Sequence, residues 1–167
     1  VRWQADAVWP LPPLPGNVRP GIEAAHRVLV TDRLVGTDDR TVVLRPPSLV
    51  VGVGASRGVS AGEVTALVRQ ALATADLSPA SVRCLATVDA KAGEAGIIEA
   101  ARELALPLRT HPAPVLAGVD VPNPSDVVRA AVGTPSVCEA AALLPPPGPR
   151  LPGQCGSGEF GAGETGS

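Results

Sequence analysis

The segment from Leu49 to Glu63, LVVGVGASRGVSAGE, constrains the fold more than any other part of the chain. It opens with an apolar run of β-forming residues, which is typical of a strand buried on both faces of a sheet. Three glycines then allow a sharp turn out of the sheet: Gly52, Gly54 and Gly58. Ser60 and Glu63 have capping-box spacing, which predicts a helix start. Amides at such a turn bind anions, but the same spacing also fits a tight turn without a ligand.

Strands and helices are predicted to alternate after this segment. Apolar residues at helical spacing predict a helix of about fourteen residues; they are Val64, Leu67, Val68, Ala71, Leu72 and Ala75. A strand is predicted at 82–88, a helix at 94–104, a short strand at 108–110, a loop at 111–118 and a helix start at Ser136. This order predicts an α/β fold, a three-layer α/β/α domain with a small, mostly parallel sheet over residues 49–144.

The two ends of the chain have a different composition, because most of its 19 prolines and 18 glycines lie there. Residues 1–21 are predicted to be an extended linker. Residues 26–33 and 40–44 are predicted to be two strands of a hairpin, so that residues 1–48 comprise a linker and a partial remnant of another domain. Residues 145–167 have no apolar periodicity and are predicted to be a disordered tail.

Charge and cysteine usage limit the kinds of partner. The formal net charge is −2, Lys91 is the only lysine, and the arginines are scattered, which argues against nucleic acid. No apolar segment approaches the roughly 18 residues of a membrane span. The three cysteines have no CxxC spacing and no matching histidines, which favours a reducing, cytoplasmic setting and no metal site. A start without Met or a signal-peptide core is typical of an internal fragment.

Ligands of parallel sheets gather at the carboxyl ends of the strands, which points to three segments of this chain. In the first, 54–58, Ser56 offers a hydroxyl and Arg57 a guanidinium suited to carboxylates, although a solvated arginine is the alternative. In the second, 87–93, Thr87, Asp89 and Lys91 alternate and could orient water or bind a polar substrate; a surface ion pair fits as well. The third is the helix start at 133–136, where capping alone would also explain Ser136.

Several other sites are excluded or unsupported. The GASRG turn is similar to the nucleotide loop of short-chain dehydrogenases, but that family needs a tyrosine and this chain has none. A phosphate-binding P-loop fails because Lys91 is followed by Ala92. His26 and His111 are too isolated for a metal pair, and no Ser–His–Asp arrangement is indicated.

Four motifs occur in order along the chain: GVGASRGVS at 52–60, ATVDAK at 86–91, VPNPS at 121–125 and VGTPSVCEAA at 132–141. Together they resemble the C-terminal domain of the cobalamin-biosynthesis CbiG family, which is shared with CobE proteins. The resemblance covers about residues 49–144. Residues 26–48 resemble the end of the CbiG central domain.

The resemblance implies a role in building the corrin ring. CbiG proteins open the δ-lactone of cobalt-precorrin-5A and release acetaldehyde. The substrate carries the cobalt, so no further cofactor is expected. The partners implied are a cobalt-corrinoid intermediate, the N-terminal domains of the same protein and other cobalamin-pathway enzymes, with no nucleic acid and no membrane.

Combined with the strand ends, the resemblance yields a set of expected site residues. The expected catalytic residues are Asp89, Ser56 and Lys91, with Asp89 activating the water. The expected substrate-binding residues are Gly54, Arg57, Gly58, Thr87, Gly133, Thr134, Ser136 and Glu139. Three hypotheses stay open on the sequence: an enzyme or part of one, a non-catalytic corrinoid-binding or carrier module, and a scaffold whose glycine turns are purely structural.

Overall fold

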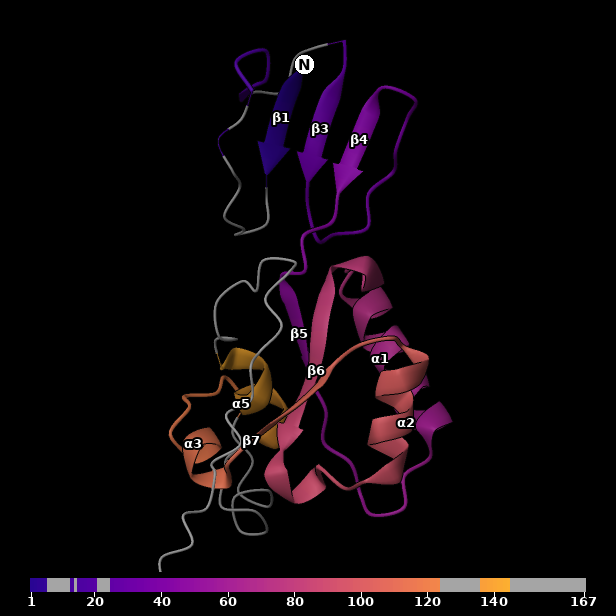
Figure 1. Ribbon diagram of the computed structural model, residues 1–167, viewed down its shortest axis with the longest axis vertical. Coiled ribbons are helices and arrows are strands. Elements are labelled where there is room, and N and C mark those ends of the chain that lie inside the picture. Colours follow the sequence, from indigo (N-terminus) through magenta and orange to yellow (C-terminus); the bar gives the residue numbers. More distant parts are fainter. Residues whose placement is uncertain (6–12, 14, 21–24, 124–135, 145–167) are drawn as a thin grey trace, which may run out of the picture.

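Two separate β-sheets are found in the part of the chain that the structure describes. The computed structural model describes residues 1–5, 13, 15–20, 25–123 and 136–144. One sheet has four strands in the order β2-β1-β3-β4, and the other has three in the order β5-β6-β7. Figure 1 shows the four-stranded sheet at one end of the molecule and the three-stranded sheet, flanked by helices, at the other. No helix within the described ranges is long and apolar enough to cross a bilayer.

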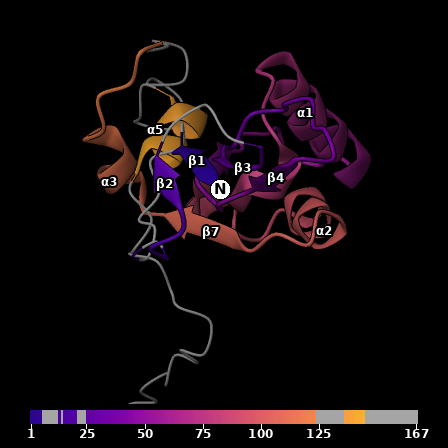
Figure 2. The same ribbon diagram turned by 90° about the horizontal axis from the view of Figure 1, so that it is seen from above.

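The three-stranded sheet is the centre of a three-layer domain, as the sequence predicts. Its parallel strands are β5 (Leu49–Gly52), β6 (Val82–Val88) and β7 (Leu108–His111). Helix α1 (Ala61–Thr74) connects β5 to β6, and α2 (Ala95–Glu103) connects β6 to β7. Because the strand order follows the sequence and such crossovers are right-handed, both helices lie on one face. Helices α3 (Ala113–Ala117) and α5 (Val137–Leu143) cover the opposite face (Figures 1 and 2).

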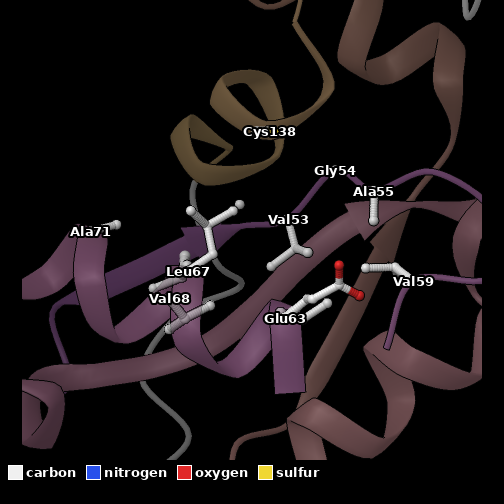
Figure 3. A pocket seen from close by; sticks show the side chains of 12 residues that line it. Val53, Gly54, Ala55, Val59, Glu63, Leu67, Val68, Ala71 and Cys138 are labelled. Atoms are coloured by element: carbon white, nitrogen blue, oxygen red, sulfur yellow. The ribbon is translucent and has the colours of Figure 1, made fainter. Parts of the chain in front are cut away.

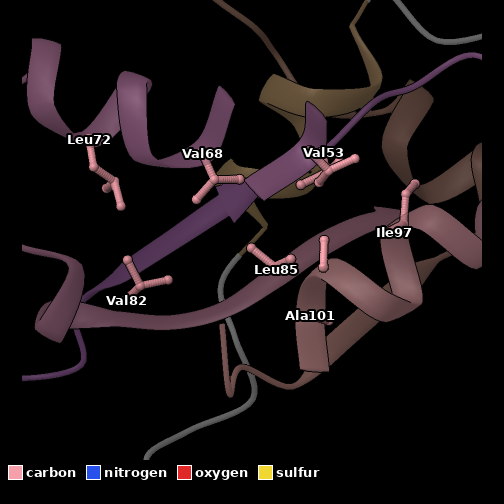
Figure 4. Packing of buried hydrophobic residues seen from close by; sticks show 9 residues of the cluster. Val53, Val68, Leu72, Val82, Leu85, Ile97 and Ala101 are labelled. Atoms are coloured by element: carbon pink, nitrogen blue, oxygen red, sulfur yellow. The ribbon is translucent and has the colours of Figure 1, made fainter. Parts of the chain in front are cut away.

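Each face of this sheet has its own apolar core. On the α1–α2 face, Leu85 and Ile97 are fully buried among valines of β5, β6 and α1 (Figure 4). On the α5 face, Ala86 and Val88 of β6 pack with Leu116, Ala140 and Ala141. Small residues dominate the second core, so α5 lies very close to the sheet. Burying each large aliphatic side chain stabilises the fold by about 1.5–3 kcal/mol.

The burial of α1 follows only half of the predicted stripe. Val64, Val68 and Leu72 are buried as expected, but Leu67 is 64% exposed, and Ala71 and Ala75 are exposed as well. Thr65 is buried in its place, and its hydroxyl donates to Glu103 Oε2 of α2 over 3.1 Å. The stripe is therefore rotated toward α2, because that helix packs beside α1 and offers Thr65 a polar partner.

The loop predicted at 111–118 contains a short helix, which corrects that prediction. After Pro112, residues Ala113–Ala117 form α3, and Leu116 is fully buried against the α5 face. Proline at the start of a helix is tolerated because its missing N–H would have no partner there. Five residues are too few for a helical periodicity to be recognised in the sequence.

The predicted hairpin is wrong, although the positions of its two strands are correct. Strands β3 (Arg27–Val30) and β4 (Thr41–Leu44) run parallel, with Arg27 opposite Thr41. They lie in one sheet with β1 (Arg2–Ala5) and β2 (Arg19–Pro20), so part of the predicted linker is sheet. The apolar pattern of a strand carries no information on direction, and the connection at 31–40 is shorter than the roughly dozen residues usual between parallel strands.

The connection between β3 and β4 is held by contacts to the three-layer domain. Ser78 N donates to the backbone carbonyl of Asp32, and Leu34 N donates to the backbone carbonyl of Asp76, each over 2.7 Å. Arg33 pairs with Leu77 in an isolated bridge. The chain thus leaves β3, contacts the turn after α1, and returns to begin β4 in the same direction.

One face of the four-stranded sheet is partly open, because alternate residues of a strand point to the same side. Val42 and Leu44 of β4 are 57% and 47% exposed, and no helix in the described part of the chain covers them. The predicted disordered tail at 145–167 lies outside the described residues.

Candidate functional site

A cavity of about 390 Å³ lies where the predicted segments meet at the carboxyl edge of the three-stranded sheet. The turn after β5, the short helical turn Asp89–Lys91 after β6, and the start of α5 surround it. Its described lining residues are Gly54, Ala55, Ser56, Val88, Lys91, Ser136, Val137 and Cys138. Four of the expected site residues are therefore brought together: Gly54, Ser56, Lys91 and Ser136.

A carboxylate that sequence reasoning did not include in the site connects two of its segments. Glu94 precedes α2, and its Oε1 accepts a 2.8 Å hydrogen bond from Gly58 N. Its other oxygen, Oε2, lies 3.6 Å from Lys91 Nζ, with only 14% and 23% of the two side chains exposed. The amide of Gly58, expected to bind substrate, is thus already occupied within the protein. Gly58 has φ +76°, a conformation that favours glycine, which allows this approach.

We expect Glu94→Ala to lower the free energy of unfolding by about 1–2 kcal/mol, because it removes a charged hydrogen bond and a partly buried ion pair. Urea unfolding measures the change. Glu99→Ala is the matched control on the same helix, since Glu99 pairs with Arg102 while both side chains are more than half exposed; a change below about 0.5 kcal/mol is expected there. Equal losses in both variants would contradict a connecting role for Glu94.

Thr87 and Asp89 have different environments at the end of β6. Thr87 is fully buried, and its hydroxyl donates to the carbonyl of Val53 over 2.7 Å. It supports the glycine turn from below and is not accessible to a ligand, which corrects its expected binding role. Asp89 is exposed and begins the helical turn that carries Lys91 into the cavity; it is not one of the described lining residues.

Arg57 is exposed and lies outside the described lining of the cavity. Within the described residues it has no hydrogen bond or ion pair. Gly133 and Thr134, two further expected binding residues, lie outside the described residues.

The start of α5, predicted at Ser136, has only half of a capping box. Ser136 Oγ accepts from Glu139 N at 3.4 Å. The Glu139 carboxylate instead accepts from Asn123 N and Nδ2, over 3.1 and 2.9 Å. Glu139 therefore holds the VPN segment against α5, and this use corrects its expected role as a substrate ligand. The capping box of α1 is complete, and hydrogen bonds from Ser60 lower the pKa of Glu63.

Close packing of α5 explains two of the three glycines in the β5 turn. A Cβ on Gly52 would overlap the carbonyl oxygen of Cys138, and one on Gly54 would lie 2.6 Å from Cys138 Sγ. Burial raises the pKa of the Cys138 thiol, which is therefore neutral at pH 7. Sequence reasoning missed this contact because nothing in the chain near residue 52 signals which distant element packs there.

These features define an α/β/α domain with a cavity at the carboxyl edge of its parallel sheet, into which the side chains of Ser56, Lys91 and Ser136 are brought. The family model described as "Cobalamin synthesis G C-terminus" matches residues 49–154. The chain belongs to this family, whose function is in cobalamin biosynthesis.

Individual relatives agree with this assignment. The chain is 40% identical over 98 residues to Protein CobE of a Sinorhizobium species, covering 58% of this chain and 64% of that protein. It is 30% identical over 145 residues to a cobalt-precorrin-5A hydrolase of Priestia megaterium, and the match covers 79% of this chain and 39% of that hydrolase. The chain is 35% identical to CobE as seen in a crystal structure, with a TM-score of 0.53; the match covers 57% of this chain and 68% of the CobE chain. The chain thus spans less than two thirds of either curated relative.

Proposed function

We propose that this chain is the corrinoid-binding part of a cobalt-precorrin-5A hydrolase. The observation that carries the proposal is the cavity into which Ser56, Lys91 and Ser136 converge from three segments. A corrin precursor bears acetate and propionate carboxylates around its ring, and an ammonium group flanked by hydroxyls suits such an anion. The cobalt belongs to the substrate, so the proposal includes no cofactor of the protein's own. The unpaired thiols of Cys84 and Cys138 suit a cytoplasmic location.

The extent of the hydrolase match supports this choice. It covers 79% of the chain, which is more than residues 49–167 alone could supply, so part of the β1–β4 region is included. Parallel sheets are normally covered on both faces. In the proposed enzyme, further polypeptide of the kind present in the longer hydrolase covers the open face around Val42 and Leu44.

The cavity residues can be assigned roles in opening a lactone. A water oxygen bonds to the carbonyl carbon, the ring acyl C–O bond breaks, and a carboxylate and a hydroxyl result. Lys91 stabilises the negative charge on the carbonyl oxygen, and Ser56 donates a hydrogen bond beside it. Asp89, in the same short helical turn as Lys91 but outside the described lining of the cavity, accepts the proton of the water. Release of acetaldehyde, as the family resemblance implies, follows ring opening.

A second function is favoured by the CobE relative, whose 40% identity is the higher of the two. In this alternative the chain binds or carries a corrinoid intermediate and performs no chemistry. The same cavity would hold the ligand, and Asp89 would have no role.

Titration of the purified chain with cobalt-precorrin-5A, followed by visible absorption and by acetaldehyde assay, tests the two functions. The hydrolase proposal expects a saturable spectral change and stoichiometric acetaldehyde on turnover. The carrier function would be favoured if the spectrum changed but no ring-opened product formed, even after the remaining part of a hydrolase had been added. An unchanged spectrum at all concentrations would exclude both.

A further inference from the structure

A second cavity, of about 420 Å³, lies on the other side of the Gly54–Ala55 turn. One wall is the face of α1 formed by Val64, Leu67, Val68 and Ala71. Residues 51–53 of the β5 region form the floor, and Cys138 of α5 lies opposite (Figure 3). The lining is almost entirely apolar, whereas the first cavity includes Lys91 and two serines among its apolar lining residues.

Leu67 and Glu63 show how this cavity meets water. The Leu67 side chain is 64% exposed although it lies on the stripe that the sequence predicts to be buried. In Figure 3 it lies between α1 and α5, beside the open space. Leaving a leucine in water forgoes stabilisation that a bound apolar group would supply. Glu63, the only charged residue in the described lining, is already held by Ser60 N and Oγ over 3.0 and 2.6 Å.

The two cavities share the same dividing wall. Gly54, Ala55 and Cys138 line both. Glycine has no side chain and alanine only a methyl group, so little material separates the two spaces. Their combined size falls within the roughly 300–1,000 Å³ of small-molecule sites, and an apolar lining with few polar groups is typical of such sites.

The charge of the first cavity indicates which end of a ligand it accepts. Lys91 is the only cationic side chain in its described lining. Glu94 is 3.6 Å from Nζ and engages a second donor at Gly58, so the ammonium keeps N–H groups for another anion. No carboxylate belongs to the described lining of this cavity.

We propose that the two cavities form one two-compartment site for an amphipathic anion. The anionic group lies beside Lys91 and Ser56, and the apolar body crosses the Gly54–Ala55 turn and covers Leu67. The identity of the natural ligand rests on the proposed function: it is a corrin precursor, a macrocycle whose carboxylates surround an apolar ring. A carboxylate of this macrocycle would bind in the compartment of Lys91, and part of its apolar ring would bind in the compartment of Leu67.

Two dyes test the site without a corrinoid: 8-anilinonaphthalene-1-sulfonate, which is amphipathic and anionic, and N-phenyl-1-naphthylamine, which lacks the sulfonate. The measurement is the rate at which iodoacetamide alkylates Cys138 near pH 9, resolved by peptide mass spectrometry. Because Cys138 lies in the shared wall, this rate is insensitive to dye on the four-stranded sheet. Saturating sulfonate dye is expected to slow alkylation about fivefold or more.

Two substitutions separate the compartments, and a third serves as their control. Leu67→Asp should raise the half-protecting concentration of both dyes about tenfold, whereas Lys91→Gln should do so only for the sulfonate. Gln70→Asp adds the same charge at an exposed α1 position outside the described lining, and should change neither. Ala71→Phe, which fills the apolar compartment, provides a second test should Leu67→Asp not fold.

The inference is overturned if the dyes give no protection, if Leu67→Asp resembles Gln70→Asp, or if Lys91→Gln affects both dyes equally. It is also overturned if Leu67→Asp abolishes self-association in sedimentation without affecting either dye, since the apolar cavity would then be an interface between copies. Normal dye behaviour with no binding of cobalt-precorrin-5A would contradict the proposed function and leave the two-compartment site standing.

Discussion

Gly52→Ala is expected to destabilise the protein by about 3 kcal/mol or more, lowering Tm by roughly 10 °C. The added Cβ would overlap the carbonyl oxygen of Cys138, and this backbone atom cannot move by changing a rotamer. Helix α5 would have to shift away from the sheet and expose part of the core that it forms with Ala86, Ala140 and Ala141. Thermal and urea unfolding followed by circular dichroism measure the effect.

Gly62→Ala is the matched control for this substitution. Gly62 lies in the first turn of α1, and a Cβ there has no atom within 4 Å. The same chemical change should stabilise the helix by up to about 1 kcal/mol. If Gly52→Ala were as stable as the parent chain, the close packing of α5 on β5 would be wrong.

The local signals of the sequence were sufficient to predict the three-layer domain. Strand β6 covers the predicted residues 82–88, and α1 has the predicted capping box at Ser60 and Glu63. These features depend on neighbouring residues, whose spacing the sequence displays directly. The direction of β3 relative to β4 depends instead on contacts of Arg33 and Asp32 with the turn after α1, which are distant in sequence.

The candidate site was predictable in position but only partly in its roles. Strand ends meet at one edge of a parallel sheet, so Ser56, Lys91 and Ser136 were expected to lie together. Thr87 and Glu139 have the residue types of ligands, yet their polar atoms are engaged by Val53 and Asn123. Whether a polar group faces a ligand or the protein depends on tertiary partners, and the spacing of residues does not specify these.

Lys91→Gln is expected to lower the rate of cobalt-precorrin-5A opening by about 10²–10³-fold, the range observed when one donor to a developing oxyanion is removed. Glutamine keeps much of the side chain's length and can donate a hydrogen bond, but it has no charge. Because the oxyanion is charged only near the transition state, turnover should fall further than the roughly tenfold loss of affinity expected when an anionic group beside Lys91 loses its cation. Acetaldehyde release and spectral titration measure the two quantities separately.

Arg69→Gln is the control for the loss of one positive charge, because Arg69 is exposed on α1 and lies outside the described lining of both cavities at the Gly54–Ala55 turn. It should leave rate and affinity within about twofold, since exposed charges are screened over a Debye length of about 8–10 Å. Equal effects of the two substitutions would reduce the role of Lys91 to long-range attraction. A loss of affinity in Lys91→Gln with unchanged turnover would assign this ammonium to a substrate carboxylate and leave the stabilisation of the oxyanion to other groups.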